Sequence, residues 1–305
     1  AARNGAGTLS RPRALRARRD GETWLLEMQG DDGTAQVVRS RALVNAAGPW
    51  VQDVIQGVTG LNSAQNVRLV KGSHIVVPKF WNGPQAYLLQ NSDRRVIFVN
   101  PYENDLALIG TTDIPYDGRA EEVAIGADET DYLFQVLRRY FRMPPQPSEI
   151  VHAFSGVRPL YDDNADNPSA VTRDYVFEVH GAEGAPPLLS IFGGKITTYR
   201  RLAEQAMQRL APWFAKLSPA WTADRPLPGG DIGGSFDDFA RALARDYRDL
   251  PQKLVHHYAR LYGTRARELL GSARVLADLG RHFGGDLYEC EAAYLRETEW
   301  ARRPA

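Results

Sequence analysis

Residues 189–200 read Leu-Ser-Ile-Phe-Gly193-Gly194-Lys195-Ile-Thr-Thr-Tyr-Arg, and this stretch decides how the chain is expected to fold. A short apolar strand ends at two glycines, and an amphipathic helix begins a few residues later. Backbone N–H groups beside Gly193 and Gly194 can approach a ligand closely, because no Cβ stands in the way. The helix start and Lys195 add positive charge, which suits a group that gains negative charge during a reaction. The same pair of glycines is also compatible with an ordinary turn.

A second strand with a small-residue ending occurs earlier in the chain. The buried strand over residues 42–45 ends in Ala46, Ala47 and Gly48, and a helix opens near Pro49. Small residues at the carboxyl end of a strand leave room for a bound cofactor in an α/β sheet. These two strand ends are therefore the first candidates for a cofactor site.

The rest of the chain predicts a mixed fold of the α/β (α+β) class. Alternating apolar residues predict several strands between residues 67 and 110, one of them over His74–Pro78. An apolar stripe at helical spacing predicts a helix over Asp128–Arg142. From about residue 227 the patterns are purely helical, which indicates a separate C-terminal helical domain.

Composition excludes several classes of function. The 305 residues are enough for about two domains, and 37 basic side chains balance 37 acidic ones, so no nucleic-acid partner is expected. The single cysteine, Cys290, excludes an internal disulfide and a cysteine-based metal cluster, and no metal-ligand spacing is present. No apolar run approaches the roughly 20 residues that span a bilayer, and no signal peptide is visible. We expect a cytoplasmic protein that is at most peripheral to a membrane.

Three further residues are candidates for chemistry. His74 begins an apolar strand and can titrate near neutral pH as a base, although a histidine there can also be a plain hydrogen-bonding residue. Arg158, between a valine and a proline, and Arg173 come from different predicted strands and can clamp a phosphate or carboxylate. The alternative is a pair of separate surface salt bridges, since Arg173 is followed by Asp174.

The combination and order of these motifs resemble a known family. The set closely resembles the FAD-dependent (respiratory, aerobic) glycerol-3-phosphate dehydrogenases, over about Thr8 to Arg303. A small departure is Ala47, where many members carry Thr. The motifs that carry the resemblance are Asn45-Ala-Ala-Gly-Pro-Trp50, Lys71-Gly-Ser-His-Ile-Val-Val-Pro78, Ile109-Gly-Thr-Thr-Asp113, Ser155-Gly-Val-Arg-Pro159, Thr172-Arg-Asp-Tyr175 and Phe192-Gly-Gly-Lys-Ile-Thr-Thr-Tyr-Arg200.

The resemblance implies an activity and the residues that perform it. The reaction is oxidation of sn-glycerol 3-phosphate to dihydroxyacetone phosphate, with hydride transfer to flavin and electrons passed to quinone. It implies His74 as the base and Arg158 and Arg173 as phosphate ligands, with Lys195 serving both substrate and flavin. FAD is the implied cofactor, and its implied contacts are Ala46, Ala47, Gly48, Trp50, Gly193, Gly194, Lys195 and Thr197.

The resemblance also implies a domain organisation and a location. Residues 1–60 and 188–226 would be the remnant of a Rossmann-like FAD-binding domain, 61–187 an antiparallel-rich substrate-binding domain, and 227–305 the helical domain. The chain would be a fragment that lacks the N-terminal segment holding the FAD pyrophosphate and the extreme C-terminus. Peripheral association with the inner face of the cytoplasmic membrane is implied, and the oligomeric state, including a homo-oligomer, stays open.

Three alternatives remain at this point. The first is a glycerol-3-phosphate oxidase that delivers electrons to oxygen, which shares the same motifs. The second is an amine or amino-acid oxidase of related fold, since paired arginines also suit a carboxylate. The third is a catalytically silent folding or docking fragment, which the implied lack of a nucleotide-binding segment favours.

Overall fold

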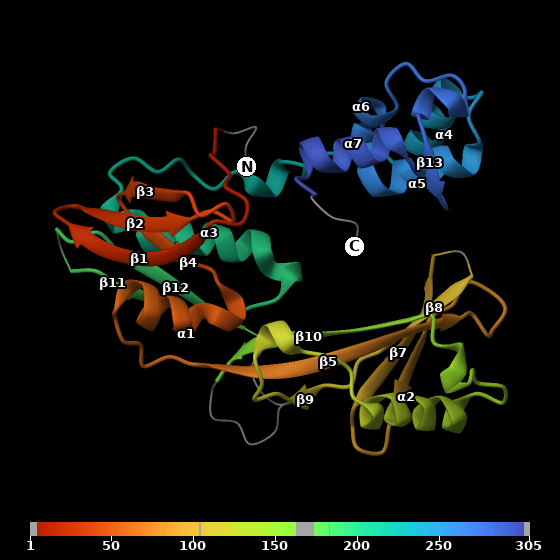
Figure 1. Ribbon diagram of the computed structural model, residues 1–305, viewed down its shortest axis with the longest axis horizontal. Helices are drawn as coiled ribbons and strands as arrows, with labels where there is room; N and C mark the ends of the chain where they lie inside the picture. Colours follow the sequence, from red (N-terminus) through yellow and green to blue (C-terminus); the bar gives the residue numbers. More distant parts are fainter. Residues whose placement is uncertain (1–4, 104, 163–173, 183, 302–305) are drawn as a thin grey trace. The chain divides into compact units, whose positions relative to one another are not determined.

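The computed structural model describes residues 5–103, 105–162, 174–182 and 184–301. The chain divides into two compact units (Figure 1). The first unit is Arg11–Ser218, and the second joins Ala1–Ser10 with Pro219–Ala305. Each unit has hydrophobic clusters of its own.

A three-stranded sheet in the first unit has the order β11-β12-β4. The strands β12 and β4 run parallel with Ser190 opposite Asn45, so both end at the same edge. An antiparallel meander of order β1-β2-β3 packs beside this sheet through Trp24, whose indole N–H donates to the Pro187 carbonyl at 3.0 Å. The bounds are β1 Arg13–Asp20, β2 Thr23–Gln29, β3 Ala35–Ser40, β4 Leu43–Asn45, β11 Tyr175–His180 and β12 Leu188–Gly193, with α1 Val51–Asp53 and a π-helical turn Val54–Thr59 after β4 and α3 Tyr199–Leu210 after β12.

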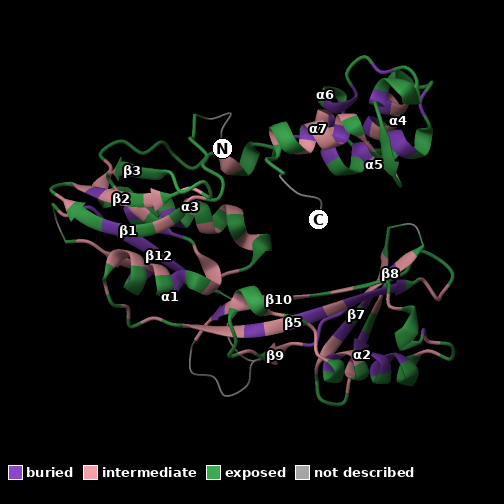
Figure 2. Ribbon diagram, viewed as in Figure 1, coloured by how far each residue is buried: buried purple, intermediate pink, exposed green. Residues whose placement is uncertain are grey.

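The second sheet of this unit is antiparallel and has six strands in the order β10-β5-β8-β7-β6, with β9 also pairing with β5. Helix α2 covers one face, and its Leu133, Phe134 and Leu137 are fully buried against the sheet. Figure 2 shows the buried residues along the strands and on one side of α2. The bounds are β5 Val67–Pro78, β6 Tyr87–Gln90, β7 Val96–Tyr102, β8 Leu106–Gly110, β9 Ile114–Pro115, α2 Ala127–Tyr140 and β10 His152–Tyr161.

The two faces of this sheet differ because successive side chains of a strand point to opposite sides. We call the face that α2 covers the back face; on β5 it carries Lys71, Ser73 and Ile75. The opposite face, which we call the front face, carries Gly72 and His74. The predicted strand over His74–Pro78 is therefore real but begins earlier, at Val67.

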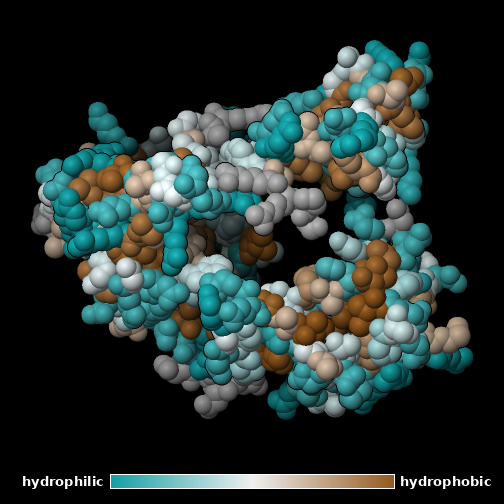
Figure 3. All heavy atoms as spheres, viewed as in Figure 1, coloured by the Kyte–Doolittle hydropathy of each residue, from teal (hydrophilic) through white to brown (hydrophobic). Residues whose placement is uncertain are grey.

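The front face is open and partly apolar. One row of cross-strand neighbours runs from Phe154 through His74 and Gly110 to Phe98 and Leu88. Leu88 is 63% exposed, Phe98 44% and Phe154 45%. Figure 3 shows apolar surface over this sheet. Since α2 covers only the back face, Leu88, Phe98 and Phe154 on the front face remain accessible to a ligand, while Val70 and Val76 of β5 are buried there.

The second unit is mainly helical, as the sequence predicts for this part of the chain. Tyr258, which is fully buried, lies in its core with Leu243 and Ala266. The unit also contains a two-stranded hairpin, which the purely helical expectation missed. Within the described ranges, no helix combines the length and apolarity needed to cross a membrane. The bounds are α4 Phe236–Asp246, α5 Gln252–Tyr262, α6 Ala266–Leu270, β13 His282–Gly284, β14 Leu287–Tyr288 and α7 Glu289–Thr298.

Candidate active site

His74 lies on the front face of β5 in a closely fitted position. Its imidazole stacks on Phe154 with ring centroids 5.1 Å apart and an interplanar angle of 9°. On the other side its cross-strand partner is Gly110. A Cβ on Gly110 would lie 2.7 Å from the His74 Cγ and Nε2 atoms, so the ring occupies the space that a side chain would need. The glycine of the Ile-Gly-Thr-Thr-Asp motif therefore makes room for the imidazole.

The surroundings of His74 favour its neutral form. Burial lowers the pKa of the imidazole from its ordinary value of 6.5, the Arg158 charge lowers it further, and Asp113 opposes these effects. Its Nδ1 atom is buried and has no hydrogen-bond partner in the described part of the chain. A neutral imidazole can accept a proton at neutral pH, which is the property a general base requires.

Arg158 reaches back along the front face toward His74. A Cβ on Gly72 would lie 3.0 Å from Nη1 and 3.1 Å from Nη2, so the guanidinium rests above this glycine, two residues from His74. Arg158 forms an ion pair with Asp113, and its Nη2 donates to Thr111 Oγ1 at 3.4 Å. The side chain is 39% exposed. It therefore presents a fixed positive charge beside a neutral imidazole, an arrangement that suits an anionic substrate with an ionisable hydroxyl.

Sequence reasoning gave no role to Thr111 and Asp113, although it recognised the motif that contains them. Asp113 is separated from Arg158 by 45 positions in the sequence. Only the pairing of β5 with both β8 and β10 brings the two together. The expected partner arginine, Arg173, lies outside the described residues, so the two-arginine clamp remains a prediction.

The parallel pair β4–β12 forms the other half of the candidate site. Gly193 and Gly194 have φ angles of +75° and +103°, which favour glycine. A Cβ on Gly193 would lie 2.8 Å from the Asp174 carbonyl oxygen, so this position also needs glycine for packing within the protein. Gly48, with φ of +56°, follows β4 at the same edge. Two parallel strands thus end side by side, and each is followed by a helical segment. After β4 the Ala47 and Trp50 N–H groups donate to Asn45 Oδ1 and to the Ala47 carbonyl, and Pro49 has no N–H. The N–H donors for an anion at this edge are therefore those at the start of the segment after β12.

The remaining predicted residues at this edge are accessible. Ala46, Lys195 and Thr197 are exposed, and Ala47 is half-buried. The Lys195 side chain makes no hydrogen bond or ion pair with the residues that the structure describes. The small side chains, glycine turns and free N–H donors at this edge fit the requirements of a dinucleotide cofactor.

Strand β10 connects the two halves of the site. A Cβ on Gly193 would lie 3.1 Å from the Tyr161 backbone nitrogen, and a Cβ on Gly48 would lie 3.8 Å from the Pro159 side chain. Phe154, the partner of His74, precedes Tyr161 by seven residues, or about 23 Å of extended strand. The structure therefore brings His74 and Arg158 together, and Gly48 and Gly193 together, without direct contact between His74 and the glycine turns.

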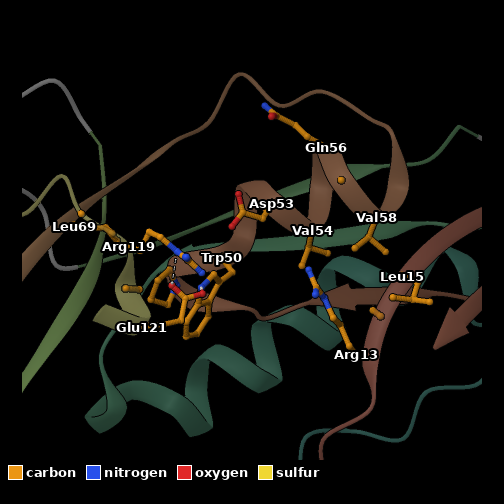
Figure 4. Close-up of a pocket in the computed structure, with 15 residues that line it drawn as sticks. Arg13, Leu15, Trp50, Asp53, Val54, Gln56, Val58, Leu69, Arg119 and Glu121 are labelled. Carbon is orange, nitrogen blue, oxygen red and sulfur yellow. Dashed lines mark hydrogen bonds and ion pairs between the residues drawn. The ribbon is translucent and has the colours of Figure 1, made fainter. Parts of the chain in front are cut away.

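Trp50 lines a cavity that the other predicted site residues in the described part of the chain do not line. It is 41% exposed, and its indole N–H donates to Glu121 Oε1 at 2.8 Å. Together with Arg13, Asp53 and Arg119 it lines an open cavity of about 1040 Å³ (Figure 4). Neither His74, Arg158, Gly193 nor Lys195 lines this cavity. A contact of Trp50 with a cofactor remains a prediction.

Replacing Gly110 with alanine (Gly110→Ala) should destabilise the sheet, because the new Cβ would overlap the imidazole of His74. We expect a loss of about 1–3 kcal/mol in the free energy of unfolding, the usual cost of overpacking. Urea unfolding followed by circular dichroism measures it. Gly156→Ala is the matched control, because a Cβ there would meet nothing within 4 Å. Equal stabilities of the two variants would contradict the fitted position of His74.

Comparison with known proteins places the chain in a family. Residues 1–200 match the family model described as "FAD dependent oxidoreductase". The chain is 53% identical over 304 residues to D-erythritol 1-phosphate dehydrogenase of Brucella abortus, covering 99% of this chain and 60% of that protein. It is 48% identical over 299 residues to a glycerol-3-phosphate dehydrogenase of Pseudomonas aeruginosa, covering 98% of this chain and 58% of that protein. The chain thus spans less than two thirds of the length of these relatives.

Comparison with a solved structure supports the same family assignment. The glycerol-3-phosphate dehydrogenase of Bacillus halodurans complexed with FAD superimposes with a TM-score of 0.74 at 25% identity. The match covers 88% of this chain and 53% of that one. The resemblance stated from the motifs and the predicted mixed α/β fold are thereby confirmed. The chain belongs to the FAD-dependent oxidoreductase family.

Proposed function

We propose that this chain carries the substrate half of an FAD-dependent glycerol-3-phosphate dehydrogenase, which oxidises sn-glycerol 3-phosphate to dihydroxyacetone phosphate. The observation that carries the proposal is the juxtaposition of His74 and Arg158 on the open front face of one sheet. One group is a neutral base and the other a fixed cation. A phosphorylated alcohol uses both, because its phosphate binds the cation and its hydroxyl proton goes to the base.

Each residue has a separate task in this proposal. The Arg158 guanidinium, held by Asp113, binds the phosphate and so fixes the position of the substrate C2 atom. The imidazole of His74 accepts the proton of the C2 hydroxyl. Arg173 is the proposed second phosphate ligand.

The edge formed by β4 and β12 would hold the FAD. Ala46, Ala47 and Gly48 would leave space for it, and the N–H groups after Gly193 and Gly194 would donate hydrogen bonds to it. Lys195 would stabilise negative charge there, with Thr197 and Trp50 as further proposed contacts. When bound, FAD supplies the acceptor for the C2 hydride.

The proposal includes the domain division and the electron acceptor. Residues 1–60 with 188–226 form the proposed FAD-binding part, 61–187 the substrate-binding part and 227–305 the helical part. Quinone is the proposed acceptor, reached by peripheral association with the cytoplasmic membrane.

A second candidate substrate is D-erythritol 1-phosphate. The relative that bears this name is 53% identical, above the 48% of the glycerol-3-phosphate dehydrogenase from Pseudomonas aeruginosa. Space on the front face is consistent with a longer polyol, because a Cβ on Gly156 would meet nothing within 4 Å. Both substrates share the phosphate and the adjacent secondary alcohol, so the same two side chains would serve either one.

An absorption spectrum tests the proposal. The protein is purified with excess FAD and mixed anaerobically with glycerol 3-phosphate or, separately, with D-erythritol 1-phosphate. We expect one of the two compounds to bleach the flavin absorption band at about 450 nm. Bound flavin that neither compound bleaches would contradict the proposed substrates. A protein that binds no flavin would favour a catalytically silent fragment, and hydrogen peroxide formation in air would indicate an oxidase.

A further inference from the structure

Glu129 of α2 is a buried carboxylate on the back face of the six-stranded sheet. Its side chain is only 3% exposed. Oε1 accepts hydrogen bonds from Ser73 Oγ and Thr112 Oγ1, both at 2.7 Å. Oε2 accepts from Lys71 Nζ at 2.6 Å and from the Gly126 N–H at 2.8 Å. All four acceptor positions of the carboxylate are thus used, which is the condition under which a charge can be buried.

The partners of Glu129 are the chain neighbours of the front-face residues. Ser73 precedes His74, and Thr112 precedes Asp113, the ion-pair partner of Arg158. On β5 the opposite directions of Ser73 and His74 follow from the alternation of side chains between the two faces. Thr112 and Asp113 lie between β8 and β9, outside both strands, and their contacts place Thr112 at Glu129 and Asp113 at Arg158. One carboxylate thus holds two separate segments that carry the proposed site.

The network continues to the third strand of the site. Ser73 Oγ lies 2.7 Å from Ser155 Oγ on β10, the strand that carries Arg158. The Ser73 N–H donates to Thr112 Oγ1 at 3.1 Å, and the Arg95 guanidinium donates to the Thr112 carbonyl at 2.9 Å. The positions of β5, the segment after β8, and β10 are therefore linked through a single set of hydrogen bonds.

The charge on Glu129 is secured by these contacts. Burial alone would raise the pKa of the carboxyl, but the hydrogen bonds from Lys71, Gly126, Thr112 and Ser73 together bring it below its ordinary value of 4.5. The group is therefore ionised at neutral pH and cannot act as a proton donor there. It does not reach the front face, so it has no route to the substrate.

We propose that Glu129 is a positioning residue, which fixes His74 through Ser73 and Arg158 through Thr112 and Asp113. The role rests on the proposed function, because it concerns the geometry of the same site. Loss of the network should leave the sheet in place but loosen the two front-face side chains. Substrate binding should then weaken more than the chemical step, since the phosphate ligand moves together with its support.

Glu129→Gln is the first test, in the FAD-loaded protein. The amide keeps the shape and one oxygen, but it removes the charge that pairs with Lys71 and replaces the acceptor at one of the two oxygen positions with an NH₂ group. We expect KM for glycerol 3-phosphate to rise about tenfold and kcat to fall about threefold. A second readout needs no substrate: the titration of His74 followed by NMR should move upward toward 6.5 as the ring becomes less buried.

Leu137→Ala is the matched control, because it weakens the packing of the same helix without touching the network. It should lower the unfolding temperature yet leave KM and the His74 titration near the wild-type values. Thr112→Val serves if Glu129→Gln fails to fold. It removes one hydroxyl at nearly constant shape and should shift KM and the His74 titration in the same directions.

The outcomes distinguish a failure of the proposed role of Glu129 from a failure of the proposed function. If Glu129→Gln or Thr112→Val gives the same KM and His74 titration as Leu137→Ala, Glu129 has only a structural role and the proposal is overturned. If the wild-type protein does not oxidise glycerol 3-phosphate, the proposed function fails. In that case the NMR titration still decides whether Glu129 positions His74.

Discussion

His74→Ala is expected to lower kcat/KM for glycerol 3-phosphate by about 10²- to 10⁴-fold, the range contributed by a positioned general base. Most of the loss should appear in kcat, because the imidazole acts on the hydroxyl proton and not on the phosphate. Steady-state kinetics of the FAD-loaded protein measures both parameters. The dissociation constant for dihydroxyacetone phosphate should change much less than kcat.

His152→Ala is the control for this variant. His152 also stacks on Phe154, with ring centroids 6.2 Å apart, but it is exposed and lies beyond the fitted position next to Gly110. Removing it disturbs the same aromatic ring and should leave kcat within about twofold of the wild-type value. Equal losses in the two histidine variants would contradict the assignment of His74 as the base.

The acid limb of the pH profile gives independent access to His74. Its pKa in the folded protein lies below 6.5, so kcat/KM should fall at a pH below this value as the imidazole becomes protonated. The free energy of unfolding should fall with falling pH, as kcat/KM does. The unfolded chain binds the proton at higher pH than the folded one, so the contribution of His74 to stability is present above 6.5 and is lost as the pH falls through the lowered pKa. A midpoint above 6.5 that His74→Ala abolishes would contradict the buried, neutral imidazole.

Local patterns in the sequence were sufficient where one segment determines its own structure. The apolar stripe predicted a helix over Asp128–Arg142, and α2 spans Ala127–Tyr140. The glycine pair and the small-residue strand end predicted the turns after β12 and β4. Their parallel pairing brings these turns to one edge. Periodicity and turn chemistry act over a few residues, so they can be read from the sequence alone.

Features that depend on contacts between residues far apart in the sequence could not be predicted from local patterns. The apolar run predicted a strand over His74–Pro78, but β5 begins at Val67. Lys71 and Ser73 lie in the added part, and their side chains contact Glu129, which lies 56 positions after Ser73. The pairing of Asp113 with Arg158 spans 45 positions. In the sequence, the polar residues of a buried network resemble those of a loop. The residues that they bond to are brought near only by the tertiary structure.

Arg158→Met is expected to lower kcat/KM by roughly 30- to 1000-fold, because one charge-assisted contact to the phosphate is worth about 2–4 kcal/mol. Methionine retains much of the aliphatic length and removes the charge. The loss should appear mainly in KM, in contrast to His74→Ala. Arg158→Lys should recover only part of it, since an ammonium cannot offer the paired N–H groups of a guanidinium.

The same variant makes a second prediction that no general weakening of the fold would produce. The Arg158 charge is one of the causes that lower the pKa of His74. Its removal should therefore shift the acid limb of the pH profile upward, toward 6.5. Arg39→Met, which breaks an exposed ion pair with Asp20 at 2.9 Å, should change neither KM nor the pH profile. An Arg158→Met protein with a raised KM but an unmoved acid limb would separate the phosphate ligand from the base, and the two could then not act on one substrate at the front face.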